Sequence, residues 1–224
     1  MNNKTVIIVA GGKGLRMQSD LPKQFMELQG KPVLMHTIDA FFKYDESIDI
    51  VLVLPSDQID FWKNLCEKHR FSIPHQIVEG GETRFHSVKN GLKNVHNTSL
   101  IAVHDGVRPL VSVETIARCF EAAAKHKAVV PVVELVDSIR ALTNNGSKSV
   151  DRNGFRMVQT PQVFENQLLQ KAYQQEFNAE FTDDASVVEA AGEKIFLVEG
   201  NRENIKITTS MDIAFSEYLL QSRE

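Results

Sequence analysis

The chain has few cysteines, no excess of positive charge and no long apolar run. Cys66 and Cys119 are its only cysteines, and both lie in helix-like segments, so we expect two reduced thiols in a cytoplasmic protein. A net charge of −4 argues against a nucleic-acid-binding or membrane-surface protein. No apolar run is long enough to cross a membrane, and the N-terminal one is too short for a signal-peptide core.

Apolar, strand-like segments alternate with amphipathic, helix-like segments along most of the 224 residues. The expected strands are 5–10, 48–54, 76–78, 100–103 and 128–133, and the expected helices are 33–44, 58–70, 85–95 and 113–127. This alternation predicts an α/β fold, in which a Rossmann-like, mostly parallel sheet is flanked by helices. In such folds ligands bind where the loops meet, at the carboxyl ends of the strands.

Residues 134–158 depart from this pattern and predict a protruding arm. Residues 133–139 alternate, Asn144-Asn145-Gly146 marks a turn, and 149–158 returns as a strand. An Asn-Gly step between alternating segments indicates a β-hairpin, and a lone hairpin is marginally stable, so we expect the arm to pack on a second subunit. The alternative is a plain surface loop.

After the arm, helices are expected near 165–176 and 183–191, a strand at 194–198, and a last helix from residue 210. We therefore expect a single domain over residues 1–224, with the arm inserted in it for dimerisation.

A glycine-rich loop follows the first strand. It runs through Ala10, Gly11, Gly12 and Gly14 to Arg16, and Lys23 comes soon after it. Glycines in this place let backbone N–H groups surround an anion, and the two cations add fixed positive charge. The loop therefore predicts a nucleoside triphosphate site. It does not match the phosphate-loop motif, and Met17 breaks the dinucleotide fingerprint. An ordinary glycine turn without a ligand is the alternative.

A carboxylate, Asp105, comes just past the strand 100–103, after His104. It is well placed to bind Mg²⁺ through one oxygen while phosphates supply other ligands. The alternative is that Asp105 caps a turn or pairs with Arg108. His104 is expected to be a packed neighbour, and we assign it no role.

Other polar residues come at further loops. Gly80, Gly81 and Ser87 open a helix and are suited to reading a base edge, although a capped glycine turn fits this spacing as well. Lys206 lies between two isoleucines, so its side chain faces either solvent or a site. Thr182 fits a helix N-cap equally well.

Eight collinear motifs together resemble the nucleotidyltransferase superfamily, and more closely the 2-C-methyl-D-erythritol 4-phosphate cytidylyltransferases of isoprenoid biosynthesis. The motifs are Ala10–Met17, Pro22–Gln24, Gly80–Gly81 with Arg84 and Ser87, His104–Asp105 with Arg108 and Pro109, Asp151–Gly154, Thr160–Gln162, Thr182–Ser186 and Asn204–Thr208.

The resemblance implies that CTP is the nucleotide, that its triphosphate lies in the loop Gly11–Arg16 and that Ala10 also contacts the nucleotide. Arg16 and Lys23 would stabilise charge on the α-phosphate during attack. Gly80 and Ser87 would help to recognise cytosine.

The resemblance also implies how the second substrate, a sugar-alcohol phosphate, is held. Asp105 would bind Mg²⁺ and lie near the substrate. Lys206 and Arg152, the latter from a partner's arm, would position the methylerythritol phosphate, with Thr182 and Arg108 nearby. Members of the family are homodimers joined through this arm.

Three other functions stay open. The related ribitol 5-phosphate cytidylyltransferases share the glycine loop and the Pro-Lys-Gln step, although the Thr182–Ser186 stretch favours the methylerythritol enzymes. A nucleotide-binding regulator without turnover has no need for Arg16, Lys23 and Asp105 together. A dehydrogenase lacks support because Met17 breaks the fingerprint and no acidic residue comes just after the second strand to bind a ribose.

Overall fold

The centre of the molecule is an eight-stranded sheet, in a computed structural model that describes residues 3–11 and 21–222. Its strands run in the order β10-β7-β11-β6-β1-β4-β5, and β12 also pairs with β7. Their bounds are β1 Lys4–Val9, β4 Asp49–Leu54, β5 Gln76–Glu79, β6 Leu100–Asp105, β7 Ala128–Glu134, β10 Arg156–Val158, β11 Gln162–Glu165 and β12 Phe196–Glu199. β1 is parallel to β4 and β6, whereas β10 and β11 are antiparallel to β7.

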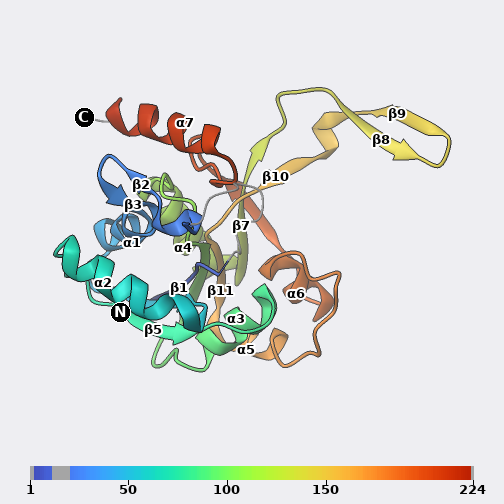
Figure 1. Cartoon of the computed structure of the whole chain (residues 1–224). Coiled ribbons are helices and arrows are strands. Elements are labelled where there is room, and N and C mark those ends of the chain that lie inside the picture. Colours follow the sequence, from blue (N-terminus) through green and yellow to red (C-terminus); the bar gives the residue numbers. More distant parts are fainter. Residues whose placement is uncertain (1–2, 12–20, 223–224) are drawn as a thin grey trace.

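Helices cover both faces of this sheet (Figure 1). They are α1 Val33–Tyr44, α2 Ile59–Lys68, α3 Arg84–Leu92, α4 Val113–His126, α5 Asn166–Ala172, α6 Asp184–Ala190 and α7 Ser210–Gln221, with short 3₁₀ turns η1 Lys23–Phe25, η2 Ser56–Gln58 and η3 Arg152–Gly154. None of these helices is long and apolar enough to span a membrane, within the residues described.

Successive residues of β1 belong to two different cores. Val6 and Ile8 pack in the cluster that contains Phe41 of α1, whereas Ile7 packs in the cluster that contains Phe85 of α3. Both faces of the strand are therefore buried, which explains why it is apolar along its length and does not alternate. The predicted mostly parallel sheet flanked by helices is confirmed.

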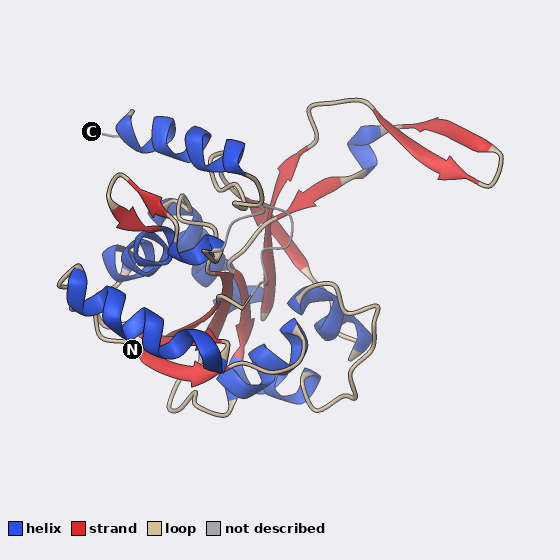
Figure 2. Ribbon diagram, viewed as in Figure 1, coloured by secondary structure: helices blue, strands red, loops and turns tan. Residues whose placement is uncertain are grey.

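The arm is a two-stranded hairpin that projects from the body of the molecule (Figure 2). β8 (Ile139–Thr143) and β9 (Gly146–Val150) pair antiparallel, so the predicted hairpin is confirmed. The prediction of one strand over 149–158 is wrong. Asp151 accepts a hydrogen bond from the backbone N–H of Asn153 and caps η3, and the chain then enters the central sheet as β10.

Two further elements differ from the sequence-based expectation. β2 (Glu27–Leu28) and β3 (Lys31–Pro32) form a small hairpin, whose turn places Gln29 and Gly30 at positive φ. β11 lies just before α5, at residues where the sequence predicted no element ahead of the helix near residue 165. Strands of two to four residues are too short to show a period, so neither was predicted.

Candidate active site

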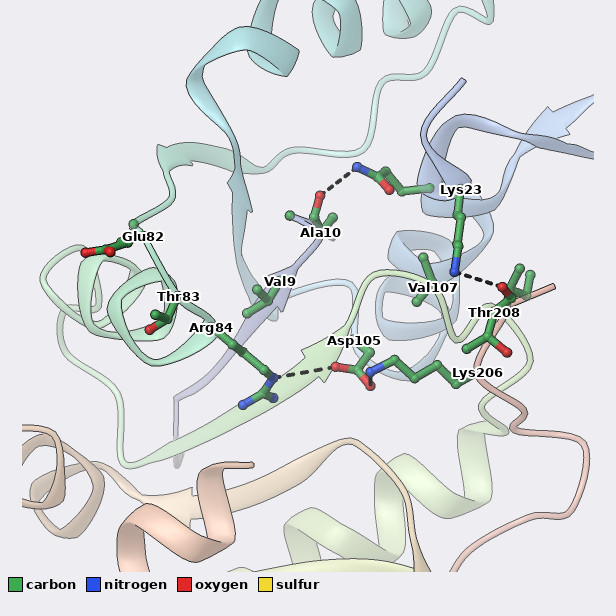
Figure 3. A pocket seen from close by; sticks show the side chains of 14 residues that line it. Val9, Ala10, Lys23, Glu82, Thr83, Arg84, Asp105, Val107, Lys206 and Thr208 are labelled. Atoms are coloured by element: carbon green, nitrogen blue, oxygen red, sulfur yellow. Dashed lines mark hydrogen bonds and ion pairs between the residues drawn. The ribbon is translucent and has the colours of Figure 1, made fainter. Parts of the chain in front are cut away.

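A cavity of about 300 Å³ lies at the carboxyl ends of β1 and β6, beside the loop that follows β5 (Figure 3). Its lining residues are Val9, Ala10, Gly11, Lys23, Gln24, Gly81, Glu82, Thr83, Arg84, Asp105, Val107, Lys206, Ile207 and Thr208. Segments far apart in the sequence thus meet at the edge of the sheet where a ligand was expected.

The structure brings five of the predicted site residues to this cavity: Ala10, Gly11, Lys23, Asp105 and Lys206. Gly12, Gly14 and Arg16 lie outside the described residues. The other predicted residues do not line the cavity as the structure describes it: Gly80, Ser87, Arg108, Arg152 and Thr182.

The Asp105 carboxylate is the centre of a cluster of positive charges. Lys206 Nζ lies 3.1 Å and Arg108 Nε 3.2 Å from Oδ2, and Arg84 Nε lies 3.7 Å from Oδ1. Figure 3 shows that Arg84 and Lys206 approach it from opposite sides. Burial alone would raise the pKa of this carboxyl, but the charges of Arg84, Lys206 and Arg108 outweigh burial and hold the pKa well below its ordinary value.

This arrangement does not fit Asp105 as a direct ligand of Mg²⁺. Both carboxylate oxygens already face cationic groups, and a divalent ion bound there would be repelled by all of them. The described residues also contain no group of three or more His, Cys, Asp and Glu that is arranged to hold a metal. The alternative, that Asp105 pairs with Arg108, is what the structure has. A requirement for Mg²⁺ in the reaction stays a prediction.

Arg84 is a cavity residue to which the sequence assigned no role. Its guanidinium makes a bidentate pair with the buried carboxylate of Asp184, at 3.0 and 2.6 Å, and the Tyr173 hydroxyl donates to the same carboxylate at 2.6 Å. The geometry fixes the planar fork of Arg84 and leaves its Nε side toward Asp105. The motif that contains Asp184 therefore acts on the cavity through Arg84.

Lys23 is held in place at the opposite wall by η1. Its Nζ donates to the Thr208 carbonyl oxygen at 2.8 Å, so Lys23 and Lys206 are tied to the same irregular segment. The neighbouring Gln24 is buried and donates to the Ala10 carbonyl oxygen at 2.8 Å. The Pro-Lys-Gln step thus joins the glycine loop to the chain that carries Lys206.

The second glycine loop is fixed by Ser87. The Ser87 hydroxyl is buried and accepts a hydrogen bond from the Gly81 N–H at 3.1 Å. A side chain at position 81 would collide with His86, so the close turn requires glycine. The Ser87 hydroxyl thus holds the loop, its part in reading a base edge stays a prediction, and Gly81 lines the cavity where Gly80 was expected.

Two predicted residues lie away from the cavity. Thr182 is exposed, and the interpretation of Thr182 as an N-cap is wrong because Asp183 caps α6 by accepting from the Ser186 N–H at 2.9 Å. Arg152 lies in η3 on the arm, where it is exposed and donates to the Val136 carbonyl oxygen.

Replacement of Asp105 with asparagine should make the free energy of unfolding less dependent on pH in acid. The folded-state pKa of Asp105 lies below the unfolded value of about 3.9, so its ionised form stabilises the fold above about pH 4. That stability is lost as the pH falls through the folded-state pKa. Urea unfolding of both proteins between about pH 4 and pH 2 should show a smaller loss in Asp105→Asn. If the free energy of unfolding fell equally with pH in the two proteins, Asp105 would not be stabilised in its ionised form by the surrounding cations.

Comparisons with known proteins agree with this geometry. The family model described as "IspD: 2-C-methyl-D-erythritol 4-phosphate cytidylyltransferase" matches residues 4–222. A 2-C-methyl-D-erythritol 4-phosphate cytidylyltransferase from Bacteroides thetaiotaomicron is 62% identical over 217 residues, which are 97% of this chain and 99% of the relative.

Two solved structures share the fold over nearly the whole chain. The 4-diphosphocytidyl-2C-methyl-D-erythritol synthase of Anaerococcus prevotii has a TM-score of 0.83 at 33% identity, over 98% of this chain and 96% of that one. The 2-C-methyl-D-erythritol 4-phosphate cytidylyltransferase of Thermus thermophilus has a TM-score of 0.81 at 32% identity, over 98% and 99%. This chain therefore belongs to the IspD family of 2-C-methyl-D-erythritol 4-phosphate cytidylyltransferases.

Proposed function

We propose that this protein transfers the cytidylyl group of CTP to 2-C-methyl-D-erythritol 4-phosphate and releases pyrophosphate, a step of isoprenoid biosynthesis. The observation that carries the proposal is the meeting of Lys23, Arg84 and Lys206 at one cavity, beside the Ala10–Gly11 end of the glycine loop. Polyanionic substrates need such an arrangement, and the similarity to named cytidylyltransferases extends over nearly the whole chain.

The reaction requires two anions to meet. A phosphate oxygen of the acceptor forms a bond to the α-phosphorus of CTP, the bond from that phosphorus to the bridging oxygen breaks, and pyrophosphate leaves with the electron pair. The protein contributes alignment and neutralisation of charge. Lys23 and Arg16 would stabilise the α-phosphate, with Ala10, Gly11, Gly12 and Gly14 around the triphosphate. Gly80 and Ser87 would shape the loop that receives the base.

The acceptor phosphate would lie on the Lys206 side of the cavity. Lys206 already places its ammonium beside Asp105, and its side chain is 47% exposed, so the ammonium is accessible to a second anion. The guanidinium groups of Arg108 and Arg84, which also contact the Asp105 carboxylate, add further positive charge. Thr182 would approach only if its loop moves toward the cavity.

Arg152 would come from the arm of a second copy of this chain. The arm points away from its own cavity, and apolar side chains on it and at its base are exposed, including Leu142 at 89% and Phe155 at 48% (Figure 1). A homodimer joined through the arms would cover these side chains and bring Arg152 to the acceptor. We further propose that residues 1–224 form one domain and that the enzyme works in the cytoplasm.

We also propose that the reaction uses Mg²⁺, with the CTP phosphates as its main oxygen ligands, since Mg²⁺ sites of this kind rely on substrate phosphates more than on protein groups. When bound, the ion would supply further neutralisation of the triphosphate. Asp105 would act on it at most through water, because its oxygens face cations.

Measuring pyrophosphate release tests the proposal directly. The protein is incubated with CTP, MgCl₂ and either 2-C-methyl-D-erythritol 4-phosphate or ribitol 5-phosphate. Release with the first acceptor, and its loss when excess EDTA is added, is the expected result. Faster release with ribitol 5-phosphate would identify the related enzyme instead. Tight CTP binding without any release would identify a regulator, and activity that persists in EDTA would exclude the role of Mg²⁺.

A further inference from the structure

His104 is fully buried and immediately precedes Asp105 in β6, and the proposed reaction does not use it. Its side chain is 0% exposed and packs edge-on against Phe41, with ring centroids 4.9 Å apart. Burial lowers the pKa of the imidazole to about 4, so the ring is neutral at physiological pH. A neutral buried imidazole has one donor and one acceptor nitrogen, and both need partners.

Both nitrogens have partners, and these fix where the proton lies. Nε2 is 3.2 Å from the Arg108 carbonyl oxygen, which can only accept, so Nε2 carries the proton. Nδ1 must then accept, and the Thr160 hydroxyl lies 3.0 Å from it as the donor. The Thr160 oxygen in turn accepts a hydrogen bond from the Asp105 backbone N–H at 3.1 Å.

These bonds form one directed chain from Asp105 through Thr160 and His104 to Arg108. The chain spans the tight turn in which the Arg108 N–H donates to the Asp105 carbonyl oxygen at 3.1 Å. It therefore holds both ends of the turn that presents Asp105 and Arg108.

The same polar network reaches Lys206. Asn204 is buried, and its side-chain Nδ2 donates to the Thr160 backbone carbonyl oxygen at 2.8 Å. The backbone carbonyl oxygen of Asn204 accepts a hydrogen bond from the Arg108 guanidinium at 2.7 Å. Lys206 follows two residues later and contacts Asp105. The positions of Arg108 and Lys206 beside Asp105 thus depend on this buried network.

We propose that His104, acting through Thr160, is a positioning residue that sets the Asp105–Arg108 turn and with it the binding of the acceptor phosphate. The inference rests on the proposed function, because it assigns these charges to the acceptor. His104 does not touch substrate. A shift of the turn by about 1 Å is enough to cost on the order of 10²-fold in rate.

Thr160→Val and Thr160→Ser test the chain as a pair. Valine keeps the shape but leaves the Asp105 N–H and His104 Nδ1 without partners, whereas serine keeps the hydroxyl. We expect kcat/KM for the acceptor to fall about 10- to 100-fold in Thr160→Val, with a smaller change in KM for CTP, and to be largely retained in Thr160→Ser.

Thr98→Val is the matched control. Thr98 lies before the opposite end of β6, and its buried hydroxyl donates to backbone oxygens of Asn3 and Leu100. Its loss should lower the melting temperature much as Thr160→Val does, with kcat/KM unchanged. Equal losses of kcat/KM in Thr160→Val and Thr160→Ser, or in Thr160→Val and Thr98→Val, would overturn the inference. Absence of turnover by the wild type would instead reject the proposed function.

One measurement depends neither on turnover nor on tolerance of valine. Nitrogen-15 NMR of the wild type should show His104 as the neutral form with the proton on Nε2; the opposite tautomer would overturn the inference. His104→Phe keeps the ring beside Phe41 and removes both nitrogens. In a double-mutant cycle, the effects of His104→Phe and Thr160→Val on kcat/KM for the acceptor should be far from additive, because both substitutions break the same chain of hydrogen bonds. Additive effects of the two substitutions would count against the inference that His104 acts through Thr160.

Discussion

Replacement of Lys23 with alanine is expected to lower kcat by at least about 10²–10³-fold while the protein stays folded. Lys23 Nζ is fixed at the cavity wall by its hydrogen bond to the Thr208 carbonyl oxygen, so it is already in place when charge develops on the α-phosphate. A preorganised donor at such a centre contributes mainly to the transition state. The same loss is expected for Arg16→Ala, although Arg16 lies outside the described residues.

Lys63→Ala is the control for Lys23→Ala. Lys63 lies on α2, is 58% exposed and, among residues 3–11 and 21–222, pairs with Asp60 alone, so its loss should change neither stability nor turnover appreciably. Steady-state pyrophosphate release gives kcat, and circular dichroism checks the fold. A folded Lys23→Ala enzyme with a kcat near that of the wild type would show that Lys23 does not stabilise the charge that develops on the α-phosphate.

Replacement of Lys206 with alanine is expected to raise the apparent KM for the sugar phosphate by about tenfold or more, since hydrogen bonds to charged groups contribute roughly 1.5–3 kcal/mol. The substitution also leaves Arg108 as the one remaining cation at Asp105 Oδ2 among the described residues, so less positive charge faces the incoming phosphate. The KM for CTP should change much less, because the triphosphate is assigned to the glycine loop and Lys23.

Lys4→Ala provides a matched control for Lys206→Ala. Lys4 lies at the amino end of β1, away from the cavity, and pairs with Asp45 at 3.1 Å, the same distance that separates Lys206 from Asp105. Its removal should leave both KM values unchanged. If Lys206→Ala raised the two KM values equally, the assignment of Lys206 to the acceptor would be wrong.

The fold was largely predictable because its strands and helices carry strong local patterns. β1, β4 and β7 are continuous apolar runs, and α1 begins and ends where the sequence predicted. The hairpin followed from one Asn-Gly step. Elements set by a few polar contacts were missed: η3 depends on the Asp151 cap and interrupts what reads as one strand.

The site was predictable where a charged residue lies at the carboxyl end of a strand or in the segment after it, as for Asp105 and Lys23. It was not predictable where function depends on partners distant in sequence. Arg84 and Asp184 lie 100 residues apart, and nothing in either segment indicates that they pair. The three cations around Asp105, which make it a poor direct metal ligand, meet only in the folded chain.

A crystal structure with CTP bound is the most direct test of the central claim, that the cavity at the carboxyl ends of β1 and β6 binds the nucleotide. We predict density for the triphosphate along residues 10–16, with its α-phosphate near Lys23 and the base toward the Gly80–Gly81 loop. Lys206 should stay available on the other side for the acceptor. A nucleotide bound at another surface, with the Lys23 cavity empty, would contradict this account.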